Sequence, residues 1–243
     1  MNLVFVFLAA FTLATDAYER GVETSVPKER EEAFNEALNL YMQLPQPSRG
    51  GGALYYNIGN TFYQLGEYPY ALLYYAKASR RMPREELPAH NIGLAREKAG
   101  LPPKEPPSIF QEIFFFHSFF SFSSRMQAFM LFSFLSFLLI SLSIWFPLRF
   151  FKMSALCTGV LTTLFLLSLA YTHYVEPLEG VLVKSTPLYR DDSTAYAPVT
   201  PQPATAGQEV RILKVTKEGS WLQVEAENGQ VGYVKEDALR LID

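Results

Sequence analysis

The spacing of apolar residues changes twice along the chain. Between residues 27 and 99, apolar side chains recur every three or four positions, the period of an amphipathic helix. Residues 126–148 and 153–175 then contain no Asp, Glu, Lys or Arg, and each run exceeds the roughly 20 residues that cross a bilayer. After residue 176, apolar and polar residues alternate between turn signals, as in short strands. This pattern predicts a multidomain α plus β membrane protein.

Residues 55–83 are the most regular part of the helical region. Gly66 separates two amphipathic helices, and Pro83 follows the second one. Small residues at Gly59 and Ala71 are expected to let the two antiparallel helices approach closely, while aromatic side chains fill the flanks. The stretch therefore predicts a tightly packed helical hairpin.

The spacing of aromatic and small residues in this hairpin resembles the tetratricopeptide repeat. The matching positions are Tyr55, Ile58, Gly59, Phe62, Gly66, Tyr68, Ala71, Tyr75, Ala78 and Pro83. A shift of about 34 residues in either direction finds partial matches, so the resemblance implies a short all-α array of about two repeats in residues 18–102.

The resemblance also implies a concave groove lined by the first helix of a repeat. By position, its partner-binding residues are Tyr56, Asn60, Tyr63 and Gln64, with His90 on a closing helix. An Asn flanked by Tyr residues suits an extended peptide, because the amide pairs with backbone groups and the rings stack. The alternative is that these side chains only pack the hairpin against its neighbours.

Residues 1–17 are predicted to be a secretory signal peptide. The apolar run 3–13 is followed by small residues, which favours cleavage after Ala14 or Ala17. The segment lacks Lys and Arg before the apolar run, which leaves an uncleaved anchor or a buried helix as alternatives.

Residues 103–124 are predicted to form a proline-rich linker and a Phe-rich segment at the membrane interface. Two transmembrane helices follow in residues 125–175. Arg149 and Lys152 occupy the connector between them, and positive charge favours the cytoplasmic side. The soluble parts are therefore expected outside the cytoplasm, anchored in the inner membrane.

Residues 176–243 resemble bacterial SH3 domains. Strands are predicted near residues 179–184, 209–216, 220–226 and 230–235, and Asn228-Gly229 is a strong hairpin signal. The resemblance rests on Gly219 to Val224 and on Gly232-Tyr233-Val234, and it implies a small all-β SH3-like barrel. Tyr189, Trp221 and Tyr233 are the residues of a possible SH3 ligand groove, with a place for Trp221 in the barrel core as the alternative.

Composition favours binding over chemistry. The net charge of -3 and the absence of a basic stripe give no reason to expect nucleic acid as a partner. Cys157 is the single cysteine, and the three histidines lack metal-ligand spacing. No nucleophile has a base and an orienting group at suggestive positions, so we expect no catalytic residue, no cofactor and no metal site.

The order of signal, short repeat array, two spans and SH3 module resembles the aerotolerance-operon (Bat) membrane proteins of the tetratricopeptide–SH3 type. That resemblance implies a non-enzymatic scaffold in the cell envelope that works with von Willebrand A-domain membrane proteins and a MoxR-type ATPase in stress tolerance. Two alternatives remain open: a sensor that binds cell-wall peptidoglycan, and an accessory subunit of an envelope enzyme.

Overall fold

The computed structural model describes residues 3–45, 51–104, 117, 119–216 and 219–242. The chain divides into two compact units, each of which is described by itself. The first unit joins residues 1–106 to residues 177–243, and the second comprises residues 107–176. The described part contains seven α-helices and one five-stranded antiparallel sheet.

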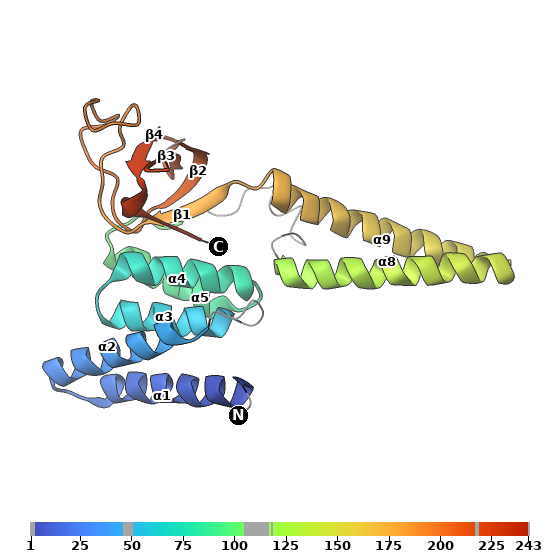
Figure 1. Cartoon of the computed structure of the whole chain (residues 1–243), viewed down its shortest axis with the longest axis horizontal. Coiled ribbons are helices and arrows are strands. Elements are labelled where there is room, and N and C mark those ends of the chain that lie inside the picture. The colour runs from blue at the N-terminus through green and yellow to red at the C-terminus, as the bar shows by residue number, and fades with distance from the viewer. Residues whose placement is uncertain (1–2, 46–50, 105–116, 118, 217–218, 243) are drawn as a thin grey trace. The chain divides into compact units, whose positions relative to one another are not determined.

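The first unit begins with five helices, each packed on the next (Figure 1). They are α1 (Leu3–Glu23), α2 (Pro27–Gln43), α3 (Gly52–Gln64), α4 (Tyr68–Arg81) and α5 (Glu86–Lys98). The predicted apolar stripe of α2 is largely buried, and Ala37 and Tyr41 are almost fully enclosed. We call these five helices the helical array.

The predicted signal peptide lies within α1, which continues past both expected cleavage positions. Ala14 and Ala17 are completely buried, the Phe11 ring meets the edge of the Tyr41 ring, and Thr15 Oγ1 lies 3.1 Å from the Tyr41 hydroxyl. These contacts make α1 the first layer of the array in the described structure and match the buried-helix alternative. Cleavage itself stays a prediction.

The close approach of α3 and α4 occurs at Gly59, as expected, but its partner differs from the prediction. A Cβ at Gly59 would lie only 2.6 Å from the Tyr75 ring. Ala71, the expected partner, is instead buried in a cluster with Ile92 and Ala95 of α5. The glycine accommodates a large aromatic ring, and the alanine accommodates the next helix.

The C-terminal part of the first unit is a curled antiparallel sheet with strand order β4-β3-β2-β1-β5 (Figure 1). The strands are β1 (Leu178–Leu182), β2 (Glu209–Val215), β3 (Trp221–Ala226), β4 (Val231–Lys235) and β5 (Leu239–Leu241). The first four overlap the predicted strands. A 3-10 turn, η1 (Glu236–Ala238), leads into β5, which the sequence analysis did not predict.

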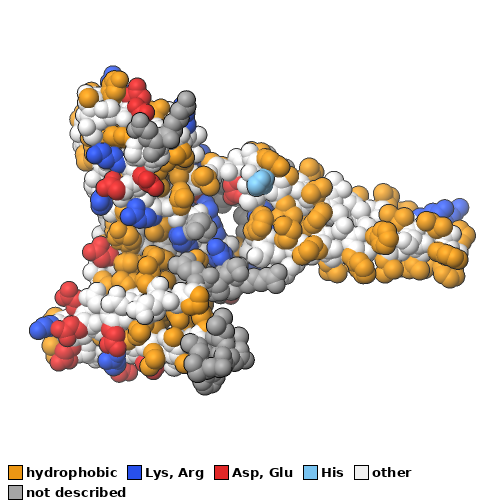
Figure 2. Space-filling view, viewed as in Figure 1, with side chains coloured by type: hydrophobic (Ala, Val, Ile, Leu, Met, Phe, Trp, Pro, Cys, Tyr) orange, Lys and Arg blue, Asp and Glu red, His pale blue; other side chains and the backbone are white. Residues whose placement is uncertain are grey.

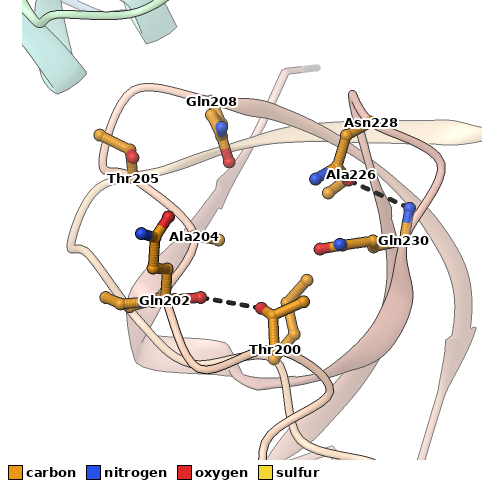
Figure 3. Close-up of a pocket in the computed structure, with 10 residues that line it drawn as sticks. Thr200, Gln202, Ala204, Thr205, Gln208, Ala226, Asn228 and Gln230 are labelled. Carbon is orange, nitrogen blue, oxygen red and sulfur yellow. Dashed lines mark hydrogen bonds between the residues drawn. The ribbon is translucent and has the colours of Figure 1, made fainter.

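A long loop joins β1 to β2 and folds back on itself. Bridges between Thr186 and Ala204 and between Tyr189 and Pro198 tie its two arms together. A pocket of about 200 Å³ lies between this loop and the β3–β4 hairpin (Figure 3). The hairpin turns at Gly229, whose φ of 76° lies in the left-handed region that glycine tolerates.

The second unit contains α8 (Phe122–Trp145) and α9 (Arg149–Tyr174), which pack side by side. In the most apolar 18-residue stretch of each helix, the mean hydropathy is 2.2 for α8 and 1.9 for α9. Only 6% of this stretch in α8 and 11% in α9 is buried. Hydrophobic side chains cover the surface of this pair in Figure 2. Both helices are therefore long and apolar enough to cross a membrane, and their apolar faces point outwards instead of into a soluble core.

Polar contacts fix the register of α8 against α9. Ser136 Oγ donates to Thr158 Oγ1 at 2.8 Å. Arg125, which is 5% exposed, donates from Nη1 to Ser168 Oγ at 2.9 Å and to Thr172 Oγ1 at 3.0 Å. Most of the predicted linker and interfacial segment, residues 105–116 and 118, lies outside the described residues.

Candidate functional site

The predicted groove of the helical array centres on a hydrogen-bonded network. Asn60 Oδ1 accepts from the Tyr75 hydroxyl at 2.9 Å and from Asn91 Nδ2 at 3.0 Å. The same Asn91 amide donates to the Tyr56 hydroxyl at 3.1 Å. Burial raises the pKa of Tyr75, so its hydroxyl remains protonated and able to donate. We call Tyr56, Asn60, Tyr75 and Asn91 the array network.

This network bears on the two alternatives for the predicted groove residues. Asn60 and Tyr56 are both half-buried and link α3 to α4 and α5, which matches the alternative that they pack the hairpin against its neighbours. The oxygen of Asn60 is already occupied by two donors from the chain itself. Asn91 is not among the residues predicted from the sequence, although it lies beside His90 on the predicted closing helix.

The other predicted groove residues, Tyr63, Gln64 and His90, are not part of the array network. The Tyr63 ring is half-buried and meets the Tyr68 ring at 5.5 Å in an edge arrangement. Gln64 and His90 are exposed. Their predicted role in partner binding stays a prediction.

The three aromatic residues predicted in the C-terminal region come together on one face of the curled sheet. The Tyr189 and Trp221 rings meet edge to face with centroids 5.5 Å apart. Tyr189 and Tyr233 exchange backbone hydrogen bonds of 2.9 and 2.8 Å, which joins the long loop to β4. Lys235, opposite Trp221 in the strand register, places Nζ 5.8 Å from the Trp221 ring centroid. We call Tyr189, Trp221, Tyr233 and Lys235 the outer aromatic face.

The alternative place for Trp221, in the barrel core, is wrong. Leu222, Val224 and Ala226 of β3 point into the core and are buried. Alternate residues of a strand point to opposite faces, so Trp221 lies on the other side, where it is half-buried. The face presents large rings next to a cation, an arrangement suited to anchoring a partner. Sequence reasoning missed Lys235, although the predicted β3–β4 hairpin contained the register that pairs it with Trp221.

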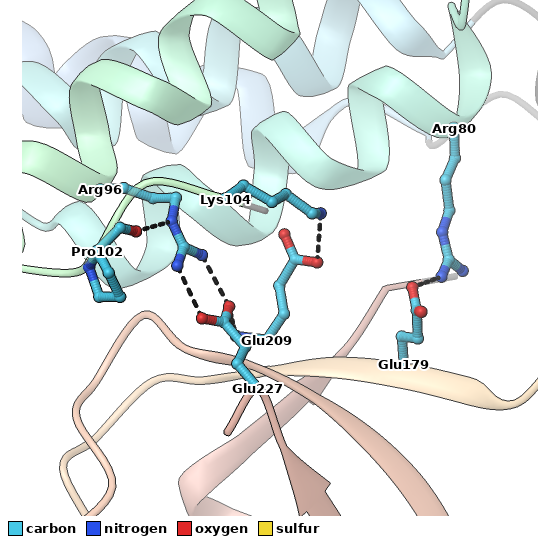
Figure 4. A network of polar contacts seen from close by, with 7 residues as sticks. All are labelled: Arg80, Arg96, Pro102, Lys104, Glu179, Glu209 and Glu227. Carbon is cyan, nitrogen blue, oxygen red and sulfur yellow. Dashed lines mark hydrogen bonds and ion pairs between the residues drawn. The ribbon is translucent and has the colours of Figure 1, made fainter. Parts of the chain in front are cut away.

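The helical array and the curled sheet are joined by ion pairs (Figure 4). Arg96 of α5 donates both Nη atoms to the Glu227 carboxylate, each at 2.7 Å, and donates Nε to the Pro102 carbonyl at 2.8 Å. The Arg96 side chain is 2% exposed, and that of Glu227 is 29% exposed. A two-point pair of this kind fixes direction as well as distance.

The electrostatics of this pair favour its charged form. Burial raises the pKa of the Glu227 carboxyl. The hydrogen bonds and charge of Arg96, together with the Glu209 backbone N–H and the charge of Lys104, outweigh burial and hold that pKa below its usual value. The hydrogen bonds that Arg96 donates to Glu227 raise the pKa of Arg96 despite its burial. Both groups are therefore charged near neutral pH.

Two further ion pairs and one close apolar contact complete the junction. Lys104 pairs with Glu209 at 2.7 Å, and Arg80 pairs with Glu179 at 2.6 Å. Gly207, with φ of 94°, sits where a Cβ would lie 2.9 Å from Leu72. The partners are far apart in sequence and belong to different modules, so no local pattern predicts these contacts.

Among the described residues, no group of three or more His, Cys, Asp or Glu side chains is placed to hold a metal ion. Cys157 is exposed on α9. Comparison with protein-family models, with curated proteins and with solved structures finds no match for this chain.

Proposed function

We propose that this protein is a non-enzymatic, membrane-anchored scaffold that binds a protein partner outside the cytoplasm. In this proposal the helical array is a short tetratricopeptide-type array, the curled sheet is an SH3-like barrel, and α8 and α9 form the anchor. The observation on which the proposal rests is the outer aromatic face, where Tyr189, Trp221 and Tyr233 gather on the solvent side of the barrel.

The ion pairs between the array and the barrel favour a single scaffold, in which the two parts are held together, over two modules that move independently. Arg96 is buried against Glu227, and additional ion pairs flank it. A partner would therefore meet a preorganised surface, and preorganisation reduces the entropy lost on binding.

The proposed orientation follows from charge. Arg149 and Lys152 lie at the turn between α8 and α9, and the positive-inside tendency puts that turn in the cytoplasm. The array and the barrel then both lie on the extracytoplasmic side of the inner membrane. The Bat resemblance makes von Willebrand A-domain membrane proteins the first partners to test.

The proposal is tested by photocrosslinking in intact membranes. A photoreactive amino acid replaces Gln223, which lies between Trp221 and Glu225 on the outer side of β3, in the full chain. We expect one discrete protein adduct, and we expect Trp221→Ala in the same chain to abolish it. The matched control places the photoreactive group at exposed Arg240 of β5, at the other edge of the sheet.

Equal adducts from positions 223 and 240, or an adduct that persists in the Trp221→Ala chain, would remove the outer aromatic face from the proposal. A separate reporter fusion after residue 243 tests the orientation. Activity of a periplasm-dependent reporter supports it, and activity only of a cytoplasmic reporter contradicts it.

A further inference from the structure

The pocket of the barrel has a chemical character that differs from the outer aromatic face. It lies between the β1–β2 loop and the β3–β4 hairpin, and no charged residue lines it. Six of its ten lining residues have amide or hydroxyl side chains, and the floor includes the buried Leu188 and Ala226. A cavity of this composition favours a neutral, polar ligand over an ion.

The amide side chains enter this pocket from several sides. Figure 3 shows Gln202 and Gln208 on the loop side and Gln230 on the hairpin side. Neither Gln208 nor Gln230 makes a side-chain hydrogen bond to another described residue, and both are half-buried. The hairpin wall is held in place because Asn228 Oδ1 accepts from the Gln230 backbone N–H at 3.1 Å. Half-buried amides without protein partners need hydrogen bonds from water or from a ligand.

We propose that this pocket binds one ring of a neutral saccharide. Each side-chain amide offers both an acceptor oxygen and an NH₂ donor, so it can pair with two neighbouring hydroxyl groups. The volume of about 200 Å³ lies below the roughly 300–1,000 Å³ of pockets for drug-sized ligands, so the pocket holds a single ring rather than a folded chain.

The same observations favour a saccharide over a peptide segment as the ligand of this pocket. An extended peptide binds by pairing its backbone along an exposed strand edge. Two loops enclose this pocket instead. The outer edge of β4, the last strand of the sheet, is already joined to the β1–β2 loop by the two backbone hydrogen bonds between Tyr189 and Tyr233. The inference concerns the barrel alone and does not depend on the scaffold role or on the outer aromatic face.

The experiment titrates the full chain in nanodiscs with chitotriose, a neutral oligosaccharide, followed by ligand-observed saturation-transfer NMR. We expect saturable binding that weakens by about tenfold in Gln230→Ala, as for the loss of a hydrogen-bonding group. Gln223→Ala, on the opposite face of the barrel, is the matched control and should bind like the wild-type chain. A trimer of galacturonic acid should bind more weakly than chitotriose, because the pocket offers no cation to its carboxylates.

A second measurement needs no variant. Hydrogen exchange of the wild-type chain with saturating chitotriose should slow in peptides covering residues 200–208 and 226–230, and not in those covering the outer aromatic face. Absence of saturable chitotriose binding would overturn the proposal. Protection confined to the outer aromatic face, or equal weakening by Gln223→Ala and Gln230→Ala, would also overturn it.

Discussion

The array network and the outer aromatic face use similar residue types for different purposes. In the array, Tyr75 and Asn91 converge on Asn60, so the amide oxygen is occupied by donors from its own chain. On the curled sheet, Trp221 and Tyr189 pack edge to face but keep part of each ring in solvent. Aromatic and amide residues at regular spacing therefore indicate a binding surface only where they remain exposed and are not hydrogen-bonded or packed within their own chain. Variants that separate stability from binding distinguish the two regions.

The largest effect is expected at the junction that holds these regions together. Glu227→Gln leaves the Arg96 guanidinium buried without a carboxylate, and breaking a buried pair costs about 3 kcal/mol when water still reaches one partner. We expect the free energy of unfolding of the first unit to fall by this amount, measured by denaturant unfolding of the full chain in nanodiscs. A change below about 0.5 kcal/mol would place the pair among ordinary surface ion pairs.

A smaller loss is expected inside the array network. Asn60→Ala leaves the Tyr75 hydroxyl and one Asn91 donor without their acceptor, which costs about 2 kcal/mol of stability. Asn60→Asp keeps an acceptor oxygen at the same place and is the matched variant, expected to retain more stability in the same unfolding measurement. If Asn60→Ala unfolds like the wild-type chain, the network does not stabilise the array.

Acid should weaken the junction in a defined direction. The pKa of Glu227 is held below its usual value, near 4.5, so the pair contributes its full stability above that pH. The contribution is lost as pH falls through the lower pKa of the folded state, while Arg96 stays charged. The melting temperatures of the wild-type and Glu227→Gln chains, measured at several pH values, should therefore converge as the pH drops below 4.5. A gap that stays constant down to pH of about 2 contradicts this linkage.

The smallest effect is expected at the exposed edge of the same junction. The Lys104 side chain is 59% exposed, and solvent screens its pair with Glu209. Lys104→Ala should therefore lower the free energy of unfolding by only about 0.5 kcal/mol, with most of that loss removed by high salt. A loss as large as that of Glu227→Gln would show that the junction depends on summed charge and not on the buried pair.

Sequence periodicity predicted α2 to α5, the two long apolar helices and four of the five strands, because each of these depends on local spacing. It did not predict α1, whose residues were assigned to a signal peptide. The grouping of Tyr189, Trp221 and Tyr233 came from the resemblance to bacterial SH3 domains, because Tyr189 lies in a loop outside the predicted strands. Helical spacing placed Gly59 against Ala71, where the structure has Tyr75, because such spacing defines a face and not the residue that crosses it. The pairing of Arg96 with Glu227 depends on tertiary packing between modules, which no local pattern encodes.

The most direct test measures stability and partner binding in the same two variants. The partner is the protein identified by its adduct at position 223, and its retention by the full chain in nanodiscs is compared for Trp221→Ala and Asn60→Ala. We expect Trp221→Ala to weaken retention about thirtyfold, as for an interface anchor worth about 2 kcal/mol, with a stability loss of only about 1 kcal/mol. Asn60→Ala should show the reverse, with lower stability and nearly normal retention at a temperature where the variant is folded. Retention lost in Asn60→Ala and preserved in Trp221→Ala would contradict the assignment of binding to the barrel and return it to the predicted groove of the array.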